Sequence, residues 1–280
     1  MSAPSTVRSG FHEGELAVQE RAGVTAAAAR LTGMLSVPDL RGGLGQFLAG
    51  RTYAAMAARD RDGRLWVSPL SGEPGFLEPT GSTTLEVRAA PAAGDPLHGL
   101  RAGQPVGLLA IEYVARRRAR INGQLVATSP DRLEIEVAEA YGNCPQYIPP
   151  RPLPAVVHAM PGTRSSGGLT ARDRSLVESL DTFVLGTTHP ERGNDASHRG
   201  GRPGFLRVES ASRLAWDDLP GNQMFNSLGN LQVDPAAALL LVDPVSGGVL
   251  QLSGRAEVRW DAATSVTRRE VGFEIESLSG

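Results

Sequence analysis

Short apolar runs separated by turn-forming residues fill most of the chain from about residue 52 onward. Pairs such as Asp62-Gly63 and Pro74-Gly75 interrupt these runs, a texture typical of antiparallel strands joined by hairpins. The pattern predicts strands over residues 52–58, 64–68, 84–88, 105–111, 116–121, 133–138, 183–187 and 214–216. The sequence therefore predicts a mainly β chain.

Helical patterns are few. Residues 12–36 are rich in Ala, Glu and Leu, with few helix breakers before Pro38, and they predict one helix with an uneven apolar face. We expect this helix to pack against the end of a barrel. A shorter helix capped by Thr170 is expected over 170–180, and another over 224–233.

The two halves of the chain resemble each other. Residues 74–76 and 203–205 both read Pro-Gly-Phe, 107–112 (GLLAIE) parallels 238–243 (ALLLVD), 122–123 parallels 253–254, and 52–53 matches 182–183. The four matches keep one order and nearly one spacing, which is the signature of a repeated unit. The chain is therefore expected to contain two diverged copies of one β unit.

Proline and glycine mark the connection between these copies. Residues 147–154 contain four prolines, and residues 162–168 add Ser and Gly, a composition typical of an interdomain linker. We expect an N-terminal helical segment over 1–40, a first barrel over 41–154 and a second over 155–280. A chain of 280 residues is long enough for two such cores.

Charge and cysteine content narrow the function classes. The formal net charge is −2, which predicts neither a nucleic-acid partner nor a membrane partner. All basic residues are Arg, so a Schiff-base or phosphate-loop lysine is excluded. The single cysteine, Cys144, cannot form an intramolecular disulfide, and no apolar run has the length of a membrane span, so a cytoplasmic location is expected.

Three polar clusters are candidates for ligand binding. Ser197-His198-Arg199, followed by two glycines, supplies donors on a chain that can approach a ligand closely; the alternative is a polar turn with a solvated Arg. Residues 222–230 supply asparagines and Ser227, which either bind a ligand or cap turns. Residues 116–120 supply four arginines, which either face an anion or protect an edge strand.

The histidines and the cysteine indicate no metal site and no catalytic nucleophile. The five histidines show no spacing typical of zinc or iron ligands. Ser197 and His198 are adjacent and therefore point to opposite sides of an extended chain. Cys144 has no basic residue beside it in the sequence, which argues against a thiolate nucleophile.

These motifs resemble the pyridoxamine 5′-phosphate oxidase-like, FMN-binding split-barrel family, and in particular its longer flavin-nucleotide-binding branch. The resemblance rests on residues 186–205 (GTTHPERGNDASHRGGRPGF), 221–235 (GNQMFNSLGNLQVDP), 12–15 (HEGE), 62–66 (DGRLW), 116–123 (RRRARING) and 141–148 (YGNCPQYI). It spans roughly residues 11 to 260. It implies a duplicated Greek-key split β-barrel with FMN as the cofactor.

The resemblance also implies a set of cofactor-binding residues. They are Arg118, Arg120, Asn143, Ser197, His198, Arg199, Trp216, Asn222, Asn226, Ser227 and Gln251. Members of the family usually carry Arg or Lys near the place of Asn226 and Ser227. This place is neutral here, so the phosphate charge must be met elsewhere, first by Arg199 and by the N-terminus of the helix expected over 224–233.

The implied function is that of a flavin-dependent oxidoreductase with an unidentified small-molecule substrate. The alternative is a non-catalytic flavin- or cofactor-binding module, because no residue stands out as a general acid or base. Simple family members bind flavin between two identical barrels, so the two halves can reproduce that interface within a monomer; a homodimer is the alternative. Only one site is expected per chain, because Ser68-Pro69-Leu70 takes the place of Ser197-His198-Arg199 and lacks the cation.

Overall fold

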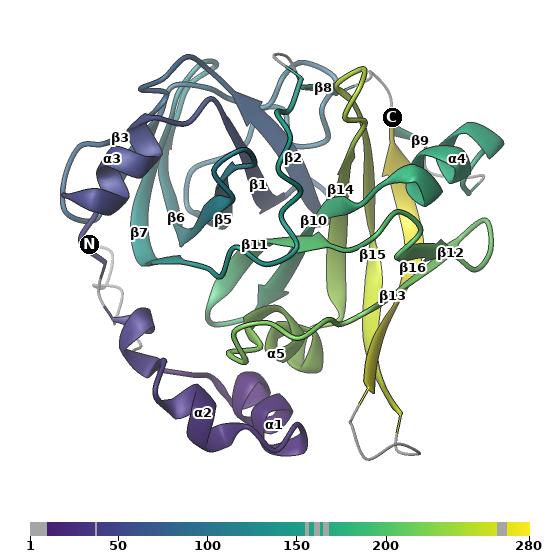
Figure 1. Ribbon diagram of the computed structural model, residues 1–280. Coiled ribbons are helices and arrows are strands. Elements are labelled where there is room, and N and C mark those ends of the chain that lie inside the picture. Colours follow the sequence, from purple (N-terminus) through teal and green to yellow (C-terminus); the bar gives the residue numbers. More distant parts are fainter. Residues whose placement is uncertain (1–9, 37, 155–156, 160–162, 165–167, 262–267) are drawn as a thin grey trace.

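The computed structural model of the protein describes residues 10–36, 38–154, 157–159, 163–164, 168–261 and 268–280. Two sheets of one seven-stranded topology pack against each other, and the helices lie around them (Figure 1). The prediction of a mainly β chain built from two split-barrel units is therefore confirmed. The boundary expected near residue 155 lies outside the described residues and stays a prediction.

The two sheets have the same strand order. The first contains β1 (Tyr53–Arg59), β2 (Leu65–Ser71), β3 (Leu77–Pro79), β4 (Thr84–Val87), β5 (Gln104–Glu112), β6 (Arg117–Thr128) and β7 (Leu133–Gly142). The second contains β10 (Thr182–His189), β11 (Gly193–Gly200), β12 (Leu206–Val208), β13 (Arg213–Asp217), β14 (Ala236–Val242), β15 (Gly248–Asp261) and β16 (Arg268–Ser279), and the short strands β8 (His158–Ala159) and β9 (Thr163–Arg164) join it. The orders are β2-β1-β5-β6-β7-β4-β3 and β11-β10-β14-β15-β16-β13-β12, so every strand of β1 to β7 has a counterpart.

Side-chain alternation along the strands creates three apolar cores. In β1, Ala54 and Met56 face the interior of the first barrel, whereas Ala55 faces the second unit. In β10, Phe183 faces the interior of the second barrel and Val184 faces the first unit. A continuous buried layer of alanine, valine, leucine and tyrosine side chains therefore joins the two units.

The two units approach closely where β5 meets β11. A Cβ atom on Gly107 of β5 would lie 2.6 Å from the carbonyl oxygen of Asn194 and 2.6 Å from the Cα of Asp195, both in β11. Only glycine allows this approach. As a result, the polar side chains of β6, beside β5, come next to those of β11.

The N-terminal segment differs from its prediction. Instead of one helix over 12–36, the chain forms α1 (Glu13–Arg21), α2 (Thr25–Ala29) and the 3-10 helix η1 (Thr32–Leu35). Gly23 adopts a left-handed φ of 69° after α1, which ends the first helix. The predicted single helix is therefore wrong because a left-handed glycine breaks it.

The other predicted helices and strands are present in the structure. Helices α4 (Ala171–Ser179), capped by Thr170, and α5 (Asn226–Val233) confirm the two shorter predicted helices, and α3 (Gly43–Ala49) was not predicted. Each predicted strand overlaps an observed one, but β6 begins at Arg117 because Arg116 lies in a turn with a left-handed φ of 51°. None of the described helices is long and apolar enough to cross a membrane.

Helix α1 packs on α5 through two glycines. A Cβ atom on Gly14 would clash with the carbonyl oxygen of Gly229, and one on Gly229 would lie 2.6 Å from the amide nitrogen of Glu15. Gln19 adds a hydrogen bond from its side-chain nitrogen to the carbonyl oxygen of Met224, at 3.1 Å. The N-terminal helix is therefore held at backbone distance from α5 (Figure 1).

Replacing Gly14 by Ala should loosen this contact. We expect the free energy of unfolding to fall by about 1–3 kcal/mol, because the added methyl group forces two backbones apart. Chemical denaturation measures the loss, and Gly33→Ala is the matched control because no atom lies within 4 Å of a Cβ built there. Equal stability of both variants would show that the two helices can separate without cost.

Candidate functional site

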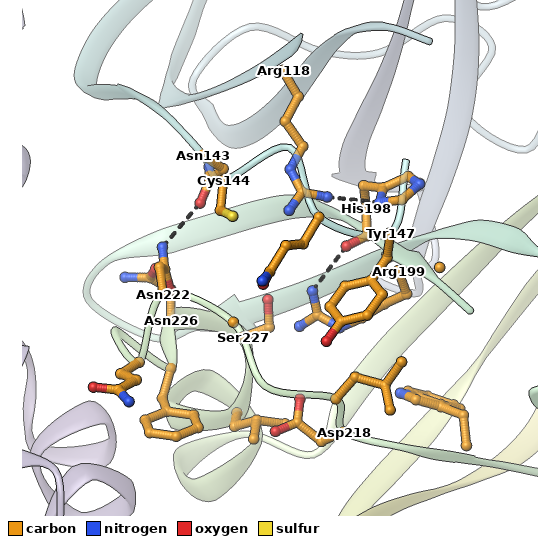
Figure 2. A pocket seen from close by; sticks show the side chains of 18 of the residues that line it. Arg118, Asn143, Cys144, Tyr147, His198, Arg199, Asp218, Asn222, Asn226 and Ser227 are labelled. Atoms are coloured by element: carbon orange, nitrogen blue, oxygen red, sulfur yellow. Dashed lines mark hydrogen bonds between the residues drawn. The ribbon is translucent and has the colours of Figure 1, made fainter. Parts of the chain in front are cut away.

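A cleft between the two units gathers most of the predicted binding residues (Figure 2). Its walls come from β6, the segment after β7, β11, the end of β13, the loop that follows β13 and the first turn of α5. Nine predicted residues line it: Arg118, Arg120, Asn143, His198, Arg199, Trp216, Asn222, Asn226 and Ser227. Residues of the first unit thus meet residues of the second in one site.

The two remaining predicted residues lie elsewhere. Ser197 is buried beneath the cleft, where its hydroxyl is 2.9 Å from that of Ser227. Gln251 is fully buried away from the cleft, and its side-chain nitrogen lies within hydrogen-bond distance of the Val67 carbonyl oxygen, the Ser68 hydroxyl and the Asp95 carboxylate. The structure therefore does not support a contact between Gln251 and a ligand in this cleft, because its amide nitrogen is used inside the fold.

A buried ion pair forms the floor of the cleft. The Arg120 guanidinium donates to the Asp195 carboxylate at 3.1 Å, and both side chains are at most one-tenth exposed. The Ser227 hydroxyl of α5 also donates to Asp195, at 3.1 Å. These contacts join β6 of the first unit to β11 and α5 of the second.

Two more guanidinium groups lie above this floor without a carboxylate partner. Within the described part of the chain, neither Arg118 nor Arg199 has a carboxylate within ion-pair distance. Burial and the positive charge of Arg120 and Arg199 lower the pKa of Arg118 to about 9, and burial and Arg120 lower the pKa of Arg199 to about 10. Both remain protonated at neutral pH, so the cleft holds uncompensated positive charge.

His198 fixes Arg118 in place. Because Arg118 can only donate, its contact at 2.6 Å makes Nδ1 of His198 an acceptor. The proton is therefore on Nε2, which faces the Thr182 hydroxyl at 2.5 Å, and Thr182 in turn donates to the Arg199 carbonyl oxygen. Both nitrogens of the imidazole are used, so His198 orients Arg118 and has no free proton to transfer.

The acidic residues at the rim do not cancel the surplus charge. Asp217 pairs with Arg207 and Arg268, and Asp218 pairs with Arg269 at 2.8 Å. Asp218 also attracts Arg199 electrostatically, but the ion pairs of both carboxylates are with arginines outside the cleft. The net electrostatic character of the interior is therefore cationic.

Three buried donors in the cleft walls have no hydrogen-bond partner among the described residues. They are Nδ2 of Asn143, Nε of Arg199 and Nε1 of Trp216. Leaving a buried donor unpaired costs about 1–3 kcal/mol. Such groups at one site indicate a ligand that is rich in acceptor oxygens.

The outer part of the cleft is apolar. Phe205 and Leu219 line it, and Tyr147 spans the mouth by donating its hydroxyl hydrogen to the Pro220 carbonyl oxygen at 3.0 Å. Leu219 and Tyr147 are each 38 % exposed. The cleft therefore joins a cationic interior to an apolar, accessible entrance.

Cys144 also lines the cleft, and it has a basic neighbour in space that the sequence does not show. The sequence offers it no basic neighbour, yet Arg118 lies close enough to interact with it electrostatically (Figure 2). The pairing comes from the packing of the segment after β7 against β6. Such a contact between separate segments leaves no local signal in the sequence.

The counterpart of this cleft in the repeat is filled. Gln251 pairs with Leu240 in β14 as Arg120 pairs with Leu109 in β5, so Gln251 occupies the position equivalent to Arg120. By the same comparison of strand pairing, the position of Arg118 is taken by Val249, that of His198 by Pro69 and that of Arg199 by Leu70. Strand β8 pairs with β15 at Val249 and covers this place.

A pair of neighbouring histidines, His12 and His189, was not predicted from the sequence. The rings of His12 and His189 lie 4.3 Å apart, and Glu13 is 3.2 Å from Nε2 of His189. Each Nδ1 accepts a backbone amide, from Gly14 in one ring and from Glu191 in the other, so each neutral ring carries its proton on Nε2. Metal ligation through Nε2 would displace these protons onto Nδ1 and break the amide bonds, so the geometry opposes a metal site.

Only the comparison with solved structures finds similar proteins. No protein-family model matches the sequence, and no curated protein matches it significantly. A candidate pyridoxamine 5′-phosphate oxidase from Lactobacillus delbrueckii is 18% identical, with 41% of this chain and 97% of that chain covered and a TM-score of 0.35. A Clostridium acetobutylicum protein of the pyridoxinephosphate oxidase family is 16% identical, with 38% and 83% covered and a TM-score of 0.28.

A third solved structure is described as a heme storage protein. It is HutZ from Vibrio cholerae, 9% identical, with 41% of this chain and 96% of that chain covered and a TM-score of 0.29. These matches include the family that the sequence motifs resemble. With such low identities and TM-scores, they assign neither an activity nor a ligand to this chain.

The locked state of His198 predicts a pH effect on stability. Burial and the arginines around it hold the pKa of His198 well below 6.5, so below pH 6.5 the unfolded chain binds a proton that the folded chain does not. The free energy of unfolding should therefore fall as the pH drops. In His198→Asn, whose Oδ1 can still accept from Arg118, this contribution is absent.

Denaturation of both proteins between pH 7.5 and pH 5 tests this effect. We expect the wild-type protein to lose its advantage over the variant by up to about 1.4 kcal/mol per pH unit below 6.5. A gap that stays constant across this range would mean that the folded protein protonates His198.

Proposed function

We propose that the cleft binds FMN and that the protein is a flavin-dependent oxidoreductase. The observation that carries the proposal is the pair of uncompensated cations, Arg118 and Arg199, in a site whose walls also hold unpaired donors. An anion with many acceptor oxygens satisfies both features at once. FMN combines a phosphate with a ring that carries two carbonyl groups.

The cationic interior suits the phosphate group. Arg118 and Arg199 supply charge-assisted hydrogen bonds, and His198 holds the Arg118 guanidinium in position. The first amide groups of α5 have no partner within the helix, and residues of this first turn line the cleft. The absence of a cation at Asn226 and Ser227 is thereby compatible with phosphate binding, because the charge comes from β6 and β11.

The remaining walls suit the ring. Phe205, Leu219 and Tyr147 give apolar contact surface, and Asn143, Asn222 and Asn226 give hydrogen bonds to a polar ring edge. Bound FMN supplies the redox chemistry, while the protein binds, orients and shields the ring. The exposed entrance at Leu219 and Tyr147 leaves access for a second reactant.

A passive flavin-binding module is the second candidate, and His198 favours it. Both nitrogens of this histidine are used, so the histidine that lines the cleft has no free proton to transfer. Anaerobic reduction of the FMN-loaded protein by nicotinamide nucleotides, followed by reoxidation with candidate acceptors, separates the two. Sustained turnover identifies an enzyme, and a flavin that is neither reduced nor reoxidised identifies a binding module.

Removing either free cation should weaken FMN binding. We expect Arg118→Ala and Arg199→Ala each to raise the dissociation constant by about tenfold or more, because a hydrogen bond to a charged group contributes about 1.5–3 kcal/mol. Quenching of flavin fluorescence measures the affinity, with the exposed Arg255→Ala as the control.

The absorbance spectrum tests the proposal itself. Purified protein incubated with FMN and freed of excess ligand should retain flavin absorbance. A colourless protein that gains none would refute FMN binding. An affinity for FMN that is unchanged in both arginine variants would place the phosphate elsewhere.

A further inference from the structure

The orientation of the asparagines in the cleft is fixed by backbone amides. The Met224 amide donates to Oδ1 of Asn222 at 3.1 Å, so the nitrogen of Asn222 faces Asn143. This nitrogen donates to Oδ1 of Asn143 at 3.1 Å. Nδ2 of Asn143 is therefore the group left over, and it is one of the unpaired buried donors.

The orientation of Asn226 is fixed from the other side, by Glu15 of α1. The Glu15 carboxylate is 3 % exposed and accepts both the His12 amide at 2.8 Å and the side-chain nitrogen of Asn226. A carboxylate offers only acceptors, so the nitrogen of Asn226 must face it. Oδ1 of Asn226, for which the described residues provide no partner, is then the group left for the cleft.

One end of the cleft thus carries a donor from the first unit and an acceptor from the second. Asn143, Asn222 and Asn226 lie together at this end, apart from Arg199 (Figure 2). A donor and an acceptor at the same end of the cleft are complementary to a carbonyl group next to a ring N–H, the imide edge found in the pyrimidine part of a flavin. A phosphate oxygen has no such N–H and is better served by Arg118 and Arg199.

We propose that Glu15 is a positioning residue that sets the hydrogen-bond polarity of this end, so that the cleft selects ligands with an imide edge. The inference deepens the proposed function and rests on it. Glu15 acts through Asn226 and does not line the cleft.

The packing of α1 gives Glu15 a fixed position. The close contact of Gly14 with Gly229 prevents α1 from sliding along α5, and Gln19 binds the carbonyl oxygen of Met224. Met224 is also the residue whose amide orients Asn222. One helix therefore supports both the donor and the acceptor of the edge.

The experiment compares FMN with 3-methyl-FMN, in which a methyl group replaces the ring N–H. Titrations are done at pH 8.5, because burial raises the pKa of Glu15 to about 7 and the carboxylate must be ionised. We expect the wild-type protein to bind FMN about tenfold more tightly than the methylated ligand, the effect of one hydrogen bond. Glu15→Ala should bring this ratio to within about twofold of unity.

Two further variants separate positioning from stability. Glu15→Gln keeps an acceptor for Asn226 and should retain most of the selectivity. Arg21→Ala removes the contact of α1 with Trp260 but leaves Glu15 in place, and it should keep the wild-type ratio. The ratio of FMN to riboflavin affinity should stay unchanged in Glu15→Ala, because the arginines are intact.

Each outcome decides the inference. A wild-type protein that does not distinguish FMN from 3-methyl-FMN would overturn the assignment of the imide edge. Equal weakening of both ligands in Glu15→Ala would reduce Glu15 to a structural residue and overturn its positioning role. Absence of binding by FMN, 3-methyl-FMN and riboflavin alike would instead refute the proposed function.

Discussion

The buried ion pair between Arg120 and Asp195 is the contact on which the site depends. It connects β6 of the first unit to β11 of the second, and Ser227 ties α5 to the same carboxylate. Removing one partner of such a pair leaves an isolated buried charge, which is far more costly than the pair is stabilising. The register of the two units is therefore fixed at the point where the cleft forms.

A surplus of positive charge follows from that arrangement. Asp195 neutralises one guanidinium, while Arg118 and Arg199 remain uncompensated and have lowered pKa values. A fold under selection for stability alone has no reason to gather these groups around three unpaired donors. The cleft is a place where the fold gives up stability, which the proposed anionic ligand would restore.

The repeated fold could be predicted from the sequence because the patterns that indicate it are local. Turn pairs, alternating strands and the recurring Pro-Gly-Phe segment each occupy a few neighbouring residues. Most of the residues that line the cleft could be predicted for the same reason, since residues 197–199 and 222–227 form continuous motifs. Gln251 was predicted wrongly to line the cleft because it occupies the position in the second unit that Arg120 occupies in the first. Only the packing of the two units shows which of these two equivalent positions faces a cleft.

Contacts between distant segments could not be predicted. Glu15 contacts Asn226, and His12 contacts His189, because α1 packs on the second unit. The sequence pattern at the start of a helix does not indicate which distant residues will contact it. The capping-box spacing from His12 to Glu15 indicates a helix start, and the structure shows the same carboxylate serving a second purpose.

The filled counterpart groove has a consequence for how such a protein can change. In a symmetric pair of identical subunits, every substitution appears twice and alters both sites together. Here Gln251, Ser68 and Asp95 form an interior hydrogen-bond network at one place while Arg120 and Asp195 stay at the other. Because the two units lie in one chain and differ in sequence, one half can mutate towards rigidity while the other adapts to a new ligand.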